Sequence, residues 1–165
     1  MTRADVMGIW QPLAASLLEK VKMIPDDAPG LDTPAWEGTF HDGEREKQEA
    51  MLTPRQLIAH CTVATYDVPR ALVMGEGFEQ IRTAGAELAK LNPSGLAQAL
   101  EQRIAKLMEF LQNLPDERFE EDVATPLGTF SVGQVLARAA LHVTHHKGQL
   151  HVVMRLMGLR PGRFI

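Results

Sequence analysis

The sequence contains few of the residues on which several classes of protein depend. Cys61 is the one cysteine in 165 residues, which excludes an intrachain disulfide framework and a zinc centre built from several thiolates. Basic residues are not in excess, because 17 Lys and Arg stand against 21 Asp and Glu. The net charge of -4 argues against a nucleic-acid partner, which would normally require a basic face. No apolar run reaches the roughly 18 residues of a membrane span, so no membrane partner is expected.

The rest of the composition is that of a folded domain. Hydrophobic residues make up 45% of the chain and charged residues 23%, which is close to the average for globular proteins. Two separate cores would each be marginal at this length, so residues 1–165 are expected to form a single domain. The first residues, MTRADVMGIW, lack the unbroken apolar core of a signal peptide, and we therefore expect a cytoplasmic protein.

Apolar residues recur at helical spacing in four stretches of the chain. This spacing predicts helices over about 4–22, 54–74, 96–114 and 132–157. The second and the fourth are each preceded by a capping box, in which Thr53 pairs with Gln56 and Ser131 with Gln134. Pro69 lies inside the second helix, where we expect a kink or a restart.

The connecting segments are less regular. Residues 78–91 are compatible with a shorter helix and Glu44–Met51 with a short polar helix, whereas residues 115–130 are expected to form an irregular connection. No stretch alternates apolar and polar residues for long enough to require a sheet. The predicted fold class is therefore all-α, with four main helices in one bundle.

The histidines are the most informative polar residues, because their position on each helix can be calculated. At about 100° per residue, His146 lies about 20° and His142 about 60° from Ala139, on the apolar stripe of the last helix. His60 shares a face of the second helix with the apolar residues Leu57 and Val63. All three histidines are therefore expected to face the interior of the bundle.

Three inward histidines allow two interpretations. Three imidazole nitrogens with a water in the fourth position form the open coordination of a catalytic metal site. A metal in such a site lowers the pKa of the bound water, or of a substrate thiol, toward neutrality. The alternative is a set of hydrogen-bonded core histidines that bind nothing, and spacing alone does not decide between the two.

Two segments resemble a known family. LIAHCTVA in the second helix and HVTHHKGQLHVVMRLMGLRPG at the end of the chain are similar to the DinB family of metal-binding four-helix bundles. That family typically has one His in the second helix and the pattern H-x-x-x-H-[RK]-G-Q-[LI] in the last. The resemblance is specific over residues 126–161, fair over 52–66 and general elsewhere.

The resemblance implies an antiparallel four-helix bundle in which His60, His142 and His146 bind one divalent metal, zinc or nickel being the usual expectation. Known activities in the family are mainly thiol-dependent transferases and isomerases, in which the metal binds a low-molecular-weight thiol, and homodimers are common. Lys147 stands where Arg is commoner, and it lacks the bidentate fork of a guanidinium. Residues 22–52 and 75–93 are longer than expected and are plausible substrate-facing insertions.

Four further residues are weaker candidates for the site. His145 adjoins a predicted ligand and can serve as an acid or base, or simply face solvent. His41 precedes the second helix and Asp67 lies two turns beyond His60, where it can orient the substrate or cap the chain after Pro69. Gln149 follows His146 by three residues and can hydrogen-bond near the metal or at a helix interface.

The sequence leaves three classes of function open for a small-molecule substrate. The first is a metal-dependent enzyme that activates a thiol for S-transfer or isomerisation. The second is a metal-dependent hydrolase that activates water at the same site. The third is a bundle in which a metal has only a structural role or is not bound at all. No feature of the sequence separates the first two.

Overall fold

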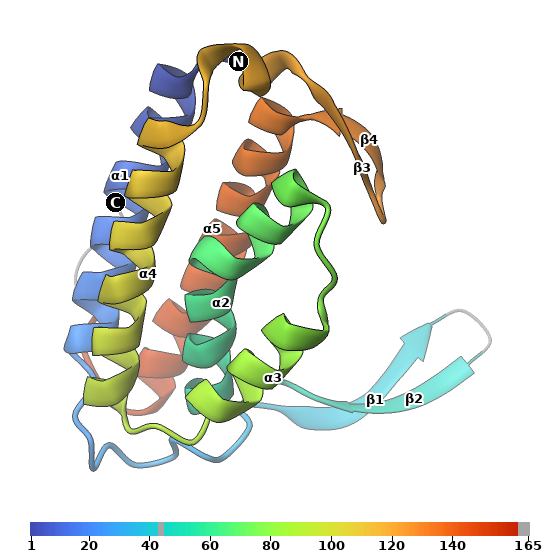
Figure 1. The fold of residues 1–165 in the computed structure, drawn as a ribbon. Coiled ribbons are helices and arrows are strands. Elements are labelled where there is room, and N and C mark those ends of the chain that lie inside the picture. Colours follow the sequence, from blue (N-terminus) through green and yellow to red (C-terminus); the bar gives the residue numbers. More distant parts are fainter. Residues whose placement is uncertain (43–44, 162–165) are drawn as a thin grey trace.

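The computed structural model describes residues 1–42 and 45–161, and within them the side chains of residues 40–48 are not described. Five α-helices contain most of the chain: α1 (Arg3–Lys22), α2 (Pro54–Met74), α3 (Glu79–Leu88), α4 (Pro93–Asn113) and α5 (Val132–Leu156). Helices α1, α2, α4 and α5 form the predicted four-helix bundle, and α3 packs against α2 (Figure 1). No helix in the described ranges is both long and apolar enough to cross a membrane.

The order of the helices around the bundle differs from their order in the chain. Helix α2 lies between α4 and α5, and α1 also contacts both of these helices from the opposite side. In Figure 1, α1 and α5 run in one direction and α2 and α4 in the other. Each helix therefore has one antiparallel and one parallel neighbour, and the chain must cross the bundle between α1 and α2 and again between α4 and α5.

Capping residues start the helices as the sequence predicts. The hydroxyls of Thr53 and Ser131 each accept a hydrogen bond from a backbone N–H in the first turn, and Oε1 of Gln56 and of Gln134 accepts one from the backbone N–H of the capping residue, so both capping boxes form. A third capping box joins Thr2 and Asp5 at the start of α1. Helix α2 continues through Pro69 to Met74 without the expected restart, and it ends at Gly75, whose φ of 68° favours glycine.

The core consists of the buried stripes of the four long helices. Trp10 of α1 is fully buried, and its indole N–H donates a hydrogen bond of 3.1 Å to the carbonyl oxygen of Leu136 in α5. Thr62 and Thr65 are also fully buried, and each hydroxyl donates to the carbonyl oxygen four residues earlier. These bonds satisfy polar groups that would otherwise be costly to remove from water.

Two β-hairpins occupy the crossing connections, where the sequence predicted no strand. Strands β1 (Glu37–Asp42) and β2 (Arg45–Ala50) pair antiparallel, so the short polar helix expected over Glu44–Met51 is wrong for the residues that the structure describes. Helix propensity is a weak preference, and pairing with a second segment overrides it here.

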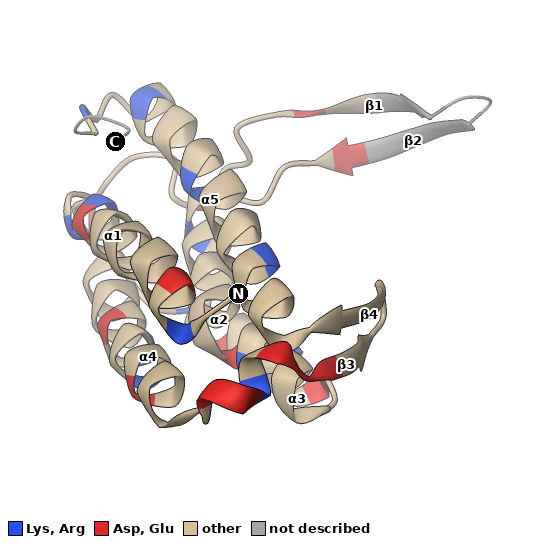
Figure 2. Cartoon of the chain, turned by 90° about the horizontal axis from the view of Figure 1, so that it is seen from above, with Lys and Arg blue, Asp and Glu red and all other residues tan. Residues whose placement is uncertain are grey.

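The second hairpin corrects the expected irregular connection over residues 115–130. A 3-10 helix, η1 (Asp116–Glu120), leads into β3 (Asp122–Thr125) and β4 (Gly128–Ser131), which pair antiparallel. Strand β3 contacts α2 and β4 contacts α5, so the hairpin bridges the two helices near one end of the bundle. Figure 2 shows that acidic residues gather along η1 and the start of β3.

Two helical glycines provide a test of this packing. A Cβ added at Gly85 in α3 would meet no atom within 4 Å, whereas one at Gly133 in α5 would lie 3.1 Å from the Cβ of Met1 and 3.2 Å from the carbonyl oxygen of Phe119. We expect Gly85→Ala to raise the free energy of unfolding by roughly 0.5–1 kcal/mol, because alanine favours the helix. We expect Gly133→Ala not to show this increase, because the added Cβ would lie too close to Met1 and Phe119. Urea denaturation followed by circular dichroism measures both, and equal stabilisation would contradict the packing at Gly133.

Candidate metal centre

Three imidazoles from two helices come together on one side of the bundle. His60 lies on α2, and His142 and His146 lie one turn apart on α5. One nitrogen from each ring lies within 4.8 Å of the corresponding nitrogens of the other two. The Nε2 atoms of His60 and His142 are 2.9 Å apart, and the ring centroids of His142 and His146 are separated by 4.4 Å. In the described part of the chain, no other group of three potential ligands meets in this way.

The cluster lies nearer the surface than the sequence predicted. His60 and His146 are half-buried, whereas His142 is exposed. The helical-wheel calculation places residues on a face but does not show how closely the neighbouring helix covers that face. The apolar stripe of α5 is exposed to solvent at His142, so the three nitrogens can be reached from outside the bundle.

The surroundings of the three rings favour their neutral forms. Partial burial, with His146 and His142 as neighbours, lowers the pKa of His60 to about 4. Burial also lowers the pKa of His142 and of His146, and nearby histidines lower both further. At neutral pH the three rings are therefore uncharged, as imidazoles must be to bind a metal.

Gln149 determines which nitrogen of His146 is available. The Nδ1–H of His146 donates a hydrogen bond of 2.7 Å to Oε1 of Gln149, three residues further along α5. Because a neutral imidazole carries one proton, this bond leaves the lone pair on Nε2. A partner of this kind commonly orients a metal-binding histidine. The sequence left the role of Gln149 open between this position and a helix interface.

The donor set fits a divalent metal of the zinc type. Nitrogen ligands lie 2.0–2.1 Å from tetrahedral zinc, which places two such nitrogens about 3.3 Å apart. The observed separations, from 2.9 Å for one pair up to a limit of 4.8 Å, bracket this value, so small side-chain rotations suffice. Three neutral ligands on one side and an open face at His142 correspond to the coordination of catalytic rather than structural sites.

The weaker candidates lie around this cluster in different ways. His145 is exposed, and its ring centroid is 5.1 Å from that of His146. Asp67 forms an ion pair of 2.6 Å with Arg103 of α4, which joins two helices of the bundle. The backbone of His41 belongs to β1, and its side chain lies outside the described residues. Lys147 is buried toward α1, where its ammonium group donates to the hydroxyl of Ser16.

Cys61 takes no direct part in the cluster, although it adjoins His60 in the chain. Its side chain is fully buried in the core. Burial also raises the pKa of the Cys61 thiol to about 12, so the thiolate does not form near neutral pH. Any thiol that reacts at the three histidines must therefore come from outside the chain.

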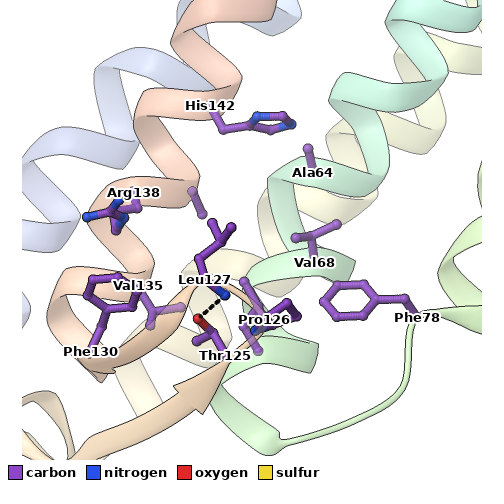
Figure 3. A pocket seen from close by; sticks show the side chains of 12 residues that line it. Ala64, Val68, Phe78, Thr125, Pro126, Leu127, Phe130, Val135, Arg138 and His142 are labelled. Carbon is purple, nitrogen blue, oxygen red and sulfur yellow. Dashed lines mark hydrogen bonds between the residues drawn. The ribbon is translucent and has the colours of Figure 1, made fainter.

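Two cavities adjoin the cluster on its two helices. One, of about 250 Å³, lies between α2, α5 and the β3–β4 hairpin and includes His142 in its wall (Figure 3). The other, of about 480 Å³, lies between α2 and α3 and includes His60. Val68 and Phe78 line both cavities and so separate them.

Sequence analysis missed the residues that shape these cavities. Arg138 is on the same face of α5 as His142 and one turn before it, a spacing that could have indicated a shared site. Phe78, Leu127 and Phe130 come from segments outside the long helices, and their positions depend on contacts that no local pattern shows. Residues 75–93 were expected to be a substrate-facing insertion, and Phe78 and α3 from this segment line the cavity beside His60.

The bundle and its cluster define a class of protein, namely helical bundles that carry a candidate metal centre of three histidines. The chain belongs to the DinB superfamily, whose family model matches residues 2–150. The resemblance found in the sequence is thereby confirmed, as is the four-helix fold. A search of curated proteins found no match.

Solved structures with similar folds share little sequence with this chain. YfiT from Bacillus subtilis, described as a probable metal-dependent hydrolase with an unusual four-helix bundle topology, is 18% identical with a TM-score of 0.65, over 96% of this chain and 89% of its own. The DinB-like protein YjoA from Bacillus subtilis is 16% identical with a TM-score of 0.64, over 94% and 93%. A mycothiol-dependent maleylpyruvate isomerase is 15% identical with a TM-score of 0.59, over 94% and 67%. At these identities the likeness establishes the fold.

The lowered pKa of His60 predicts how the stability of the metal-free protein changes with pH. The unfolded chain takes up a proton near pH 6.5 and the folded protein only near pH 4, so the free energy of unfolding should fall as the pH drops between these values. The variant His60→Gln should show a shallower fall, because it removes one of the groups responsible. Thermal unfolding in the presence of a chelator measures this, and identical slopes would contradict the assignment.

Proposed function

We propose that this protein is a metal-dependent enzyme in which His60, His142 and His146 hold one divalent metal, zinc or nickel. The observation that carries the proposal is the meeting of three neutral imidazoles beside two cavities. When bound, such a metal lowers the pKa of a thiol or water in its open position toward neutrality. The match to the DinB superfamily supports the same assignment.

The reaction that we place first is thiol-dependent S-transfer or isomerisation. The thiol loses its proton, and the sulfur attacks an electrophilic carbon of the substrate so that a carbon–sulfur bond forms. In a transfer the leaving group departs with the electron pair of its bond to that carbon and takes up the proton. In an isomerisation the carbon–sulfur bond breaks again, and the thiol is regenerated with its proton. Two separate cavities suit two reactants, and the buried Cys61 requires the thiol to be an external low-molecular-weight one. The mycothiol-dependent isomerase with the same fold supports this choice.

The residues of this chain have distinct tasks in that reaction. The three histidines bind the metal on one side and leave the side toward the cavities open. Gln149 keeps the proton of His146 on Nδ1, so that Nε2 stays a ligand. The apolar wall beside His142 offers a surface on which an apolar part of the substrate can be buried. His145 lies beyond the ligands on the exposed side of α5, where it is a candidate acid or base for the substrate.

Hydrolysis is the second candidate function. Water replaces the thiol as the nucleophile, and the same three histidines hold the metal. The description of YfiT as a probable metal-dependent hydrolase favours this alternative. We further propose that the protein is a cytoplasmic homodimer that acts on a small molecule, and light scattering after size-exclusion chromatography tests the dimer.

Metal analysis tests the site itself. The wild-type protein should carry about one divalent metal per chain after purification or after loading with zinc or nickel. His146→Ala should lose the metal, whereas the neighbouring variant His145→Ala should retain it. Gln149→Leu should weaken metal affinity by roughly 10–100-fold, because it removes the hydrogen bond that orients His146. Wild-type protein that binds no metal after loading, or His146→Ala that still binds it, would overturn the proposal.

Activity assays distinguish the two reactions. We expect metal-loaded protein to accelerate thioether formation between a small thiol and 1-chloro-2,4-dinitrobenzene, and expect His146→Ala to lose the acceleration. We expect no metal-dependent hydrolysis of 4-nitrophenyl acetate in the absence of a thiol. Ester hydrolysis that depends on the metal, without any thiol reaction, would instead assign the protein to the hydrolases. Elemental analysis of each sample confirms that the metal is present.

A further inference from the structure

We propose that the cavity beside His142 binds a small carboxylic acid with an aryl or medium-length alkyl group, and that Arg138 recognises its carboxylate. This names a substrate class for the site described above, and it rests on the proposed function. The inference comes from the size of the cavity, the character of its wall and the position of one unpaired cation.

The cavity is large enough for an organic group rather than for solvent alone. Its volume of about 250 Å³ exceeds the roughly 150 Å³ in which an apolar protein cavity can hold a benzene molecule. Its wall is formed largely by apolar side chains of α2, α5 and the β3–β4 hairpin, together with Phe78: Ala64, Val68, Leu72, Pro126, Leu127, Phe130, Val135 and Ala139. Such a wall selects an apolar ligand by burying its surface.

The polar groups of the wall are few, and one of them is already engaged. The hydroxyl of Thr125 donates to the carbonyl oxygen of Gly128 and accepts from the backbone N–H of Leu127, as Figure 3 shows in part. This hydroxyl therefore serves the turn between β3 and β4. Arg138 and His142 are the polar side chains of the wall that remain for a ligand.

Arg138 is held at one side of the cavity by an aromatic ring. Its guanidinium carbon lies 4.4 Å from the centroid of the Phe130 ring, on which it stacks. No acidic side chain in the described ranges pairs with it. Stacking leaves the N–H groups at the edge of the guanidinium plane free, and their fork matches the two oxygens of a carboxylate.

The position of Arg138 on α5 relates the carboxylate to the reacting atoms. Arg138 and His142 are four residues apart, about 6 Å along the helix axis. A carboxylate at Arg138 thus places the adjoining carbons within reach of His142, while the apolar group fills the space toward Val68 and Phe78. In Figure 3, Arg138 and Phe130 lie on one side of Leu127, and Val68 and Phe78 on the other.

The second cavity provides a matched control. It also contains one arginine, Arg82, but this residue lies on α3 beside His60 and is separated from the first cavity by Val68 and Phe78. If the proposal is correct, Arg82 does not contribute to binding of the acid. A reactant thiol is left free to use that second cavity.

Calorimetric titration of the metal-loaded protein with 4-phenylbutyrate and with the uncharged 4-phenyl-1-butanol tests the proposal. The acid should bind more tightly than the alcohol. Arg138→Gln should weaken binding of the acid by roughly tenfold or more and leave the alcohol unchanged, because it removes charge-assisted hydrogen bonds. Arg138→Lys should recover part of the loss, and Arg82→Gln should behave like wild type. Arg138 is exposed, so its substitution leaves the fold intact.

Two further variants separate this proposal from the metal site. Leu127→Asp, at an exposed position over the cavity, should weaken the acid through repulsion. His146→Ala should still bind 4-phenylbutyrate, because Arg138 does not depend on the metal. Wild-type protein that takes up no metal after loading but still binds the acid through Arg138 would therefore count against the proposed function alone. Equal affinity for acid and alcohol, no binding of either, or equal losses in Arg138→Gln and Arg82→Gln would overturn the inference.

Discussion

The close antiparallel contact between α2 and α5 is the constraint on which the site depends. His60 is on one helix and His142 and His146 are on the other, so no single helix can form the cluster. Helices α2 and α5 share an extensive contact, and the buried residues Ala64 on α2 and Ala139 on α5 line the cavity between them. A shift of one residue on either helix would rotate its histidine by about 100° away from the others. The capping boxes at Thr53 and Ser131 fix where each helix begins and so help to prevent such a shift.

The cluster is unfavourable for protons and suited to a metal cation for the same physical reason. The three imidazoles lie within a few ångströms of one another and are partly removed from water. A proton on one ring would place a positive charge away from solvent and beside other histidines, so the pKa of each ring is lowered. A divalent ion between the rings instead interacts with all three lone pairs at once. Oε1 of Gln149 accepts a hydrogen bond from the Nδ1–H of His146, which leaves the lone pair of that ring on Nε2. Among the described residues the cluster consists of three neutral imidazoles, so it would add no negative charge to a cation that it held.

The parts of this structure that could be predicted from the sequence are those determined locally. Helical periodicity and the capping boxes identified α2 and α5 closely, and the same periodicity brought the three histidines to one side of the bundle. The hairpins could not be found in this way, because pairing of β1 with β2 and of β3 with β4 depends on a second segment rather than on either strand alone. For the same reason the exposure of His142 was missed, since it depends on how far the hairpin and α2 cover that turn of α5. The spacing of Arg138 from His142 was a signal in the sequence, but the stacking of Arg138 on Phe130 depends on the position of the hairpin and could not be predicted.

The bundle carries the three histidines, whereas the connections between its helices carry residues that shape the cavities beside them. His60, His142 and His146 lie on two long helices, α2 and α5, whose relative position is fixed by a continuous core. The cavities are completed by Phe78 before α3 and by the β3–β4 hairpin, which lie outside the bundle and contact it at one edge. Connections tolerate changes in length and sequence that a packed helix interface does not. A bundle of this kind can therefore keep one metal centre while the connections change which molecule reaches it, so the fold by itself does not determine the reaction. In this protein, the segment around Phe78 and the hairpin that carries Leu127 and Phe130 form the cavity walls that α2 and α5 leave open, so a change of sequence in these two elements would alter the cavities while leaving the three histidines in place.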